Sequence, residues 1–220
     1  MVSEKAKGAS LVSAGLPEHL GVLYAERADE IRQRLDDFSR VKRSRWFYEL
    51  CFCLMTPQSS AVHASMVQAE LESMDFLSNG QDVIDVLRSP DRYIRFHNTK
   101  HARLHRARHE WSRIEAVIAN TGLSARDRRN VLREMVDGFG MKEASHFLRN
   151  IGMRGLAIID RHLLTNMVAC GIFDEAPSVS TVSKYLDVEM RFAAYCESIG
   201  IDMDEIDLLF WCAQTGHILK

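Results

Sequence analysis

A lysine and an aspartate are the two residues of this sequence best placed to do chemistry together. Lys142 falls in the first turn of an expected helix, whose positive end disfavours an ammonium ion and so favours the neutral, nucleophilic amine. Asp160 is expected to cap another helix, where the same effect keeps its carboxylate ionised. A neutral amine can attack an electrophilic carbon while a nearby carboxylate stabilises developing positive charge.

A hairpin between two helices has to bring these residues together. Gly138 and Gly140 interrupt a helical pattern, and both can adopt the positive φ values of a tight turn. The backbone N–H groups at the start of the next helix would then point outward, which suits a phosphate group. A helix over residues 142–150 rises about 13 Å. The return segment, residues 153–160, could span roughly 20 Å if extended, so Asp160 can return beside Lys142.

Five short segments resemble the motifs of one enzyme family, both in their residues and in their order along the chain. The G-x-G-x-K hairpin continues as KEASHFLRNIG and is followed by LAIIDRHLL, which is similar to the helix-hairpin-helix DNA glycosylases. The segments FCLMTPQSSA, RFHNTK and LLFWCAQTGHILK narrow this resemblance. Together, from about residue 46 to residue 220, they resemble the type-2 8-oxoguanine DNA glycosylase/AP lyase family.

The resemblance implies a bifunctional enzyme of base excision repair that acts on double-stranded DNA containing 8-oxoguanine or abasic sites. Lys142 would attack C1′ of the nucleoside, and Asp160 would stabilise the positive charge on the sugar as the base leaves. The lysine–sugar Schiff base then acidifies C2′ and allows β-elimination of the 3′ phosphate. Gly138 and Gly140 would bind a DNA phosphate, and His162 would hydrogen-bond around Asp160.

Four further residues are expected to contact the flipped nucleotide or its gap. By resemblance, Gln58 would fill the gap in the duplex, although a solvent-exposed glutamine is an equally good interpretation. Phe96 and Trp211 are candidates to sandwich the base, and core packing is the more frequent role of either aromatic residue alone. 8-Oxoguanine carries a proton on N7, and the α-carboxylate of Lys220 could accept a hydrogen bond from it.

Positive charge is concentrated in one segment. The formal net charge is −2 and the pI about 6.5, which is unusual for a nucleic-acid binder and requires a local basic patch. Residues 92–113 hold many arginines and lysines and one glutamate, so they form either a face along DNA phosphates or a solvated polar face. The basic residues are Arg92, Arg95, Lys100, Arg103, Arg106, Arg108 and Arg113.

The sequence predicts no metal and no cofactor. Four histidines, at positions 97, 101, 105 and 109, share one helical face, but no carboxylate or cysteine ligand lies between them. The 5 cysteines are odd in number and lack the spacing of a zinc site or an iron–sulfur cluster, so they predict reduced thiols. No segment has the length of a membrane span, and residues 1–10 do not resemble a signal peptide. We expect a monomer in the cytoplasm of a prokaryote.

The expected fold is all-α, with two helical subdomains and the helix-hairpin-helix at the cleft between them. Residues 58–160 would form one helical bundle, and residues 1–57 would pack with residues 161–220 as the other lobe. Two alternatives stay open at this point. The same chemistry could act on an oxidised pyrimidine, or the chain could be a non-catalytic helix-hairpin-helix module, which would have no reason to keep Lys142 and Asp160.

Overall fold

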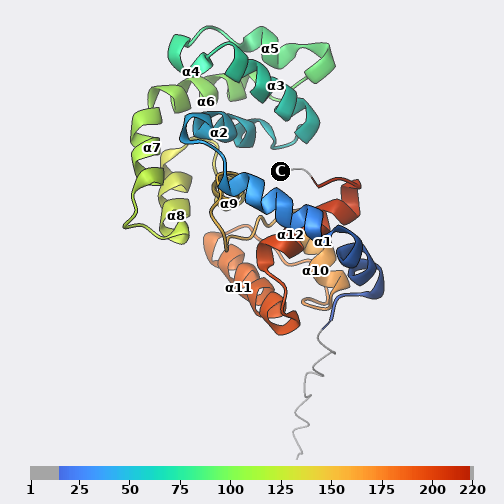
Figure 1. Cartoon of the computed structure of the whole chain (residues 1–220). Coiled ribbons are helices and arrows are strands. Elements are labelled where there is room, and N and C mark those ends of the chain that lie inside the picture. The colour runs from blue at the N-terminus through green and yellow to red at the C-terminus, as the bar shows by residue number, and fades with distance from the viewer. Residues whose placement is uncertain (1–14, 219–220) are drawn as a thin grey trace, which may run out of the picture.

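The computed structural model describes residues 15–218, and all regular secondary structure in that range is helical (Figure 1), which confirms the predicted all-α class. The first half contains α1 (Glu18–Ser39), α2 (Trp46–Met55), α3 (Ala61–Ser73), α4 (Phe76–Asn79), α5 (Ile84–Arg88), α6 (His97–His109) and α7 (Trp111–Ala119). The second half contains α8 (Ala125–Met135), α9 (Met141–Asn150), α10 (Arg161–Ala169), α11 (Val182–Ile199) and α12 (Met203–Thr215). None of these helices is long and apolar enough to cross a membrane.

Helix α2 is the centre of the first of two hydrophobic cores. Apart from Glu49 its sequence is apolar on every face, and every residue from Phe47 to Met55 is buried. Helices α3, α6 and α9 pack against it, and the core continues to Leu156. A helix with almost no polar face needs neighbours on all sides, and the first core supplies them.

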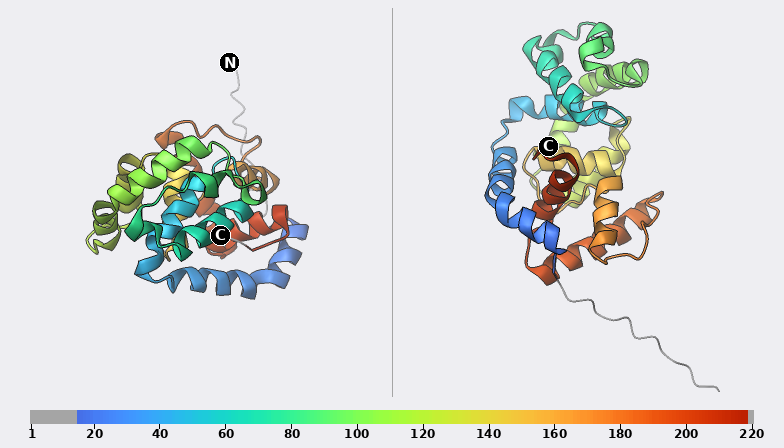
Figure 2. Two further views of the ribbon diagram at one scale, coloured as in Figure 1. Left: turned by 90° about the horizontal axis from the view of Figure 1, so that it is seen from above. Right: turned by 90° about the vertical axis from the view of Figure 1, so that its right-hand side faces the viewer.

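The second core is built by helices from the two ends of the chain. Helix α1 packs along α12, and α10 and α11 complete the cluster. Figures 1 and 2 show α1 and α10–α12 at one end of the molecule, with α3–α6 at the other. Helix α9 lies between the two groups: Met141 joins the second core, while Phe147 and Leu148 join the first. The division into lobes at residues 57 and 160 stays a prediction.

The hairpin between α8 and α9 is fixed by its caps. The Ser124 hydroxyl accepts a hydrogen bond from the Asp127 N–H, and the Asp127 carboxylate accepts one from the Ser124 N–H, so α8 begins with a capping box. Gly138 has φ of +96°, a conformation that favours glycine, and it turns the chain between the helices. Gly140 then precedes α9 as its N-cap. The turn therefore places Lys142 in the first turn of α9, as predicted.

A glycine follows the end of helix α9, and the chain returns in an extended form. Gly152 has φ of +91°, and a Cβ atom there would lie 2.7 Å from the Cα of Ser39, so α1 also leaves no room for a side chain. Residues 156–160 contain no helix or turn and lead directly into α10. The predicted extended return from α9 to Asp160 is therefore present.

Candidate active site

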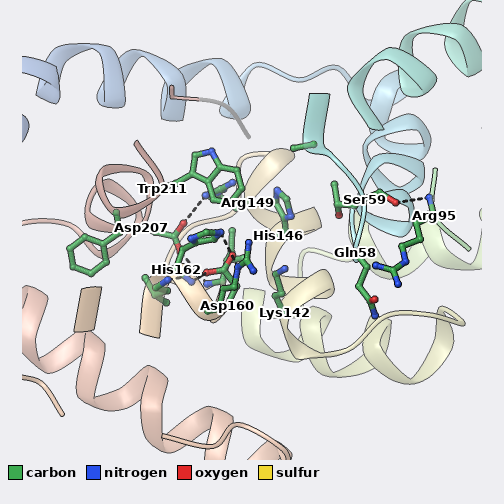
Figure 3. Close-up of a pocket in the computed structure, with 16 residues that line it drawn as sticks. Gln58, Ser59, Arg95, Lys142, His146, Arg149, Asp160, His162, Asp207 and Trp211 are labelled. Atoms are coloured by element: carbon green, nitrogen blue, oxygen red, sulfur yellow. Dashed lines mark hydrogen bonds and ion pairs between the residues drawn. The ribbon is translucent and has the colours of Figure 1, made fainter. Parts of the chain in front are cut away.

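A cavity of about 750 Å³ lies between elements of the two cores (Figure 3). Its walls come from the turn between α2 and α3, from Arg95, from α9, from the N-terminus of α10 and from α12. This volume falls in the range of pockets that enclose small molecules. Lys142 and Asp160 both line it, together with Gln58 and Trp211. The structure thus brings four of the sequence-predicted residues to one cavity.

Lys142 reaches the cavity from the first turn of α9. Its side chain is half-buried, and it lines a second, smaller cavity beside Gly140 as well as the main one. Met141 and Ala144 on the same helix are buried in the second and the first core. Because both faces of α9 are fixed by packing, the position of the Lys142 backbone is fixed too.

Asp160 is the N-cap of α10, as predicted. Its Oδ1 accepts hydrogen bonds from the backbone N–H groups of His162 at 2.8 Å and Leu163 at 2.9 Å. Those two bonds fix the carboxylate at the positive end of the helix. Both hydrogen bonds of the cap use Oδ1. Among the described residues, Oδ2 takes no part in the cap. A carboxylate held in this way can face a developing positive charge in the cavity.

Side chains of α11 and α12 hold the extended segment that leads to Asp160. Three consecutive backbone N–H groups donate hydrogen bonds to buried side chains. In a β-sheet, such groups would instead donate to the carbonyl groups of a neighbouring strand. The pairs are Ala157 N–H to Glu189 Oε1 at 2.9 Å, Ile158 N–H to Asp207 Oδ2 at 3.2 Å, and Ile159 N–H to the Tyr185 hydroxyl at 3.1 Å. The Tyr185 hydroxyl in turn donates to the Ala157 carbonyl at 2.7 Å.

Two buried arginines hold these acceptors in place. Arg129 of α8 pairs with both carboxylate oxygens of Glu189, and Arg149 of α9 donates to Asp207 Oδ1 at 2.9 Å. Burial raises the pKa of Asp207 to about 7, although the Arg149 guanidinium opposes the rise. The helices of the hairpin are thereby joined to the segment that carries Asp160.

Gln58 and Phe96 share an unusual backbone conformation. Gln58 has φ of +57° and Phe96 has φ of +60°. Both values lie in the left-handed region, which residues other than glycine rarely adopt. Gln58 lines the cavity, whereas Phe96 is absent from the described lining and is 51% exposed. Such strain concentrates at binding sites. Phe96 follows Arg95, which does line the cavity, so its role against the base stays a prediction.

Trp211 and His162 pack against each other at the cavity wall. Their ring centroids are 5.5 Å apart and the rings are nearly perpendicular, at 87°. The His162 ring accepts a hydrogen bond from Arg161, so its link to Asp160 is made by the backbone N–H and not by the ring. The tryptophan could present a ring face to a flat ligand. Lys220, the other expected base contact, lies outside the described residues.

The turn at Gly138 and Gly140 differs from the prediction in one respect. Gly140 has an extended conformation, with φ of −102° and ψ of −169°, so only Gly138 uses a positive φ. The Gly140 N–H donates to Glu143 Oε2 at 3.0 Å. One of the N–H groups expected to face a phosphate therefore has a carboxylate partner, and a phosphate here would have to displace Glu143.

Most of the chain matches proteins of one family. A family model described as 8-oxoguanine DNA glycosylase matches residues 31–201. The chain belongs to the 8-oxoguanine DNA glycosylase family. Among its relatives, the 8-oxoguanine DNA glycosylase/AP lyase of Fusobacterium nucleatum is 34% identical, and the match covers 90% of this chain and 94% of that protein.

Solved structures of the glycosylase family have the same fold. The Thermotoga maritima 8-oxoguanine DNA glycosylase has a TM-score of 0.81 at 26% identity, covering 92% of this chain and 97% of that one. The Methanocaldococcus jannaschii 8-oxoguanine glycosylase/lyase, crystallised with a 15mer DNA containing 8-oxoguanine, has a TM-score of 0.80 at 30% identity, covering 91% and 97%. As a member of this family, the chain is a DNA glycosylase with AP lyase activity.

The basic segment of this glycosylase is divided between surface and interior. Lys100 is only 2% exposed and cannot contact a phosphate. Arg108 donates to the backbone carbonyls of Phe76, Leu77 and Ser78, so it is also used within the protein. Arg103 and Arg106 remain on the surface and pair with Asp137, next to the hairpin glycine. The seven positive charges therefore do not form one continuous face.

The histidines of that segment make contacts with each other and with one carboxylate. His101 Nε2 lies 2.9 Å from Asp82 Oδ1, and the rings of His101 and His105 are 4.6 Å apart. Within residues 15–218, no group of three or more histidine, cysteine or acidic side chains is arranged to hold a metal ion.

Sequence reasoning missed several residues of the glycosylase cavity, among them His146, Arg149 and Asp207. His146 lies one helical turn after Lys142 on α9, and Asp207 lies one turn before Trp211 on α12. Helical periodicity applied to Lys142 and Trp211 would have found both, because residues four apart share a helix face. Arg149 lies on the same face, seven residues after Lys142, but an arginine near the end of a helix is normally solvated.

Proposed function

We propose that this glycosylase releases 8-oxoguanine from duplex DNA and then cleaves the strand through an imine on Lys142. One observation carries the proposal: a helix-start lysine and a helix-capping aspartate line the same cavity. The relative from Methanocaldococcus jannaschii, crystallised with DNA containing 8-oxoguanine, supports the choice of substrate. A non-catalytic DNA-binding module would need neither residue.

The proposed reaction assigns one task to each residue. The neutral Lys142 amine adds to C1′ as the bond between C1′ and the base breaks, and the base leaves with the bonding electrons and takes up a proton. The Asp160 carboxylate stabilises the positive charge on the sugar. Opening of the ring gives an iminium ion, C2′ then loses a proton, and the 3′ phosphate leaves by β-elimination. Water finally releases Lys142.

The substrate is tested by trapping on two lesions. The enzyme is incubated with borohydride and a duplex that carries either one 8-oxoguanine or, in the same sequence, one oxidised pyrimidine. We expect a covalent protein–DNA band mainly with 8-oxoguanine. Equal trapping with the oxidised pyrimidine would contradict the assigned base and leave the imine chemistry intact. Trapping with neither lesion, but with a preformed abasic site, would leave only the lyase step.

DNA binding is proposed to use the surface arginines beside the hairpin. Replacing Arg103 and Arg106 by glutamate reverses two charges and should make log affinity fall less steeply with log salt concentration. Each phosphate that the protein neutralises adds about 0.9 to that slope. Affinity for a lesion duplex is measured at several salt concentrations. An unchanged slope would show that this surface is solvated in the complex.

We propose that the enzyme acts as a monomer on duplex DNA in the cytoplasm. Every residue assigned to the reaction comes from one chain, so a monomer suffices. The relatives named above come from bacteria and archaea, which agrees with a prokaryotic cytoplasm.

A further inference from the structure

Lys100 is a buried cation without an acidic partner. Its side chain lies on α6 and is 2% exposed, and no ion pair among residues 15–218 includes it. Burial lowers its pKa to about 8. Burying an unpaired ammonium group is costly, so a lysine is expected at such a position only where its hydrogen bonds are needed.

Those hydrogen bonds all go to the turn that carries Gln58. The Lys100 ammonium donates to the Met55 carbonyl at 2.6 Å, to the Pro57 carbonyl at 2.7 Å and to the Ser59 hydroxyl at 3.0 Å. The three acceptors bracket Gln58, whose φ is +57°. A glutamine keeps a left-handed backbone conformation only where surrounding contacts fix it. The three hydrogen bonds of the Lys100 ammonium group are contacts of this kind.

Lys100 also belongs to the turn that carries Phe96. Its backbone N–H donates to the Phe96 carbonyl at 3.0 Å, in the first turn of α6. The Ser59 hydroxyl, which accepts from the Lys100 ammonium, also accepts from the Arg95 N–H at 2.9 Å (Figure 3). One lysine and one serine therefore join the two strained turns, and each turn contributes a residue to the cavity lining, Gln58 from one and Arg95 from the other.

We propose that Lys100 is a positioning residue that aligns Gln58 with Arg95 and Phe96, so that the two turns enter the duplex together when the damaged nucleotide leaves the stack. The inference rests on the proposed function, because it requires that Gln58 and Phe96 contact DNA. Lysine suits this task because its ammonium group has three donors and no acceptor. Methionine has a similar length and supplies no donor.

The test compares Lys100→Met with a matched control on the same helix. Arg108→Met also removes a cation that donates to three backbone carbonyls, but those belong to Phe76, Leu77 and Ser78, away from the cavity lining. Single-turnover excision is measured on 8-oxoguanine in a duplex and in a single strand of the same sequence. We expect Lys100→Met to slow duplex excision by about tenfold to a hundredfold, the effect of a small misplacement, and single-strand excision much less.

The control separates positioning from general stability. Arg108→Met should leave the ratio of duplex to single-strand rates unchanged, whatever its melting temperature. If Lys100→Met slows both substrates equally, or has no effect, the positioning role is wrong. Should Lys100→Met fail to fold, Ser59→Ala tests the same link, since it removes the shared acceptor and leaves Lys100 two partners. It should lower the ratio in the same direction, and an unchanged ratio would overturn the inference.

A double-mutant comparison connects Lys100 to Gln58. If Lys100 acts through Gln58, adding Lys100→Met to Gln58→Ala should slow duplex excision far less than Lys100→Met slows the wild type. Fully additive effects would overturn the inference. A silent Gln58→Ala, by contrast, would show that the proposed insertion of Gln58 is wrong, while trapping through Lys142 would be unaffected.

Discussion

Replacing Lys142 by glutamine is expected to abolish both strand cleavage and borohydride trapping on a duplex that contains 8-oxoguanine. Glutamine is polar and only one atom shorter than lysine but has no nucleophilic amine, so no imine can form. Lesion binding should be nearly unchanged, because the cavity and its other walls remain. Cleavage and trapping are measured on denaturing gels, and binding by the equilibrium affinity for the same duplex.

Lys184→Gln is the matched control for this variant. Lys184 is an exposed lysine on α11, and no cavity described above includes it. It should trap and cleave like the wild type. Persistent trapping by the Lys142 variant at the wild-type level would move the nucleophile to another amine of the chain.

Asp160→Asn is expected to reduce release of 8-oxoguanine by about a hundredfold to a thousandfold, the usual effect of removing one transition-state contact. Asparagine caps helices as well as aspartate does, so α10 should still begin at Arg161 and the fold should be kept. The substitution removes the negative charge that we propose stabilises the sugar cation. Base release is measured in a single turnover, and the affinity for the duplex should change only modestly.

Asp202→Asn provides the comparison, since Asp202 caps α12 in the same way and does not line the cavity. Its Oδ1 accepts the Asp204 N–H at 2.8 Å. Normal base release in the Asp202 variant would show that changing a cap is harmless in itself. Normal release in the Asp160 variant would remove Asp160 from the mechanism.

Local signals in the sequence were enough to predict the hairpin and the positions of Lys142 and Asp160. Gly138 acts on the chain within a few residues of itself, so a turn can be predicted without knowing the fold. The same is true of Asp160 as an N-cap. The expected helix over residues 142–150 differs from the observed α9, Met141–Asn150, by one residue.

Long-range contacts explain what the sequence did not predict. Lys100 was read as part of a basic surface because its neighbours along the chain are basic, yet its partners are residues 55–59. Glu189 and Asp207 could not be assigned because their acceptor role depends on an extended segment far away in the sequence. Charged residues are mostly exposed, so burial of a charge is visible only once its partner is placed.

The central claim is that Lys142 becomes covalently attached to the sugar, and the attachment site can be identified directly. The wild-type enzyme is trapped with borohydride on a duplex containing 8-oxoguanine, the adduct is digested with protease and nuclease, and the modified peptide is sequenced by mass spectrometry. The account predicts a reduced sugar adduct on Lys142. An adduct on any other amine, with Lys142 unmodified, would contradict it.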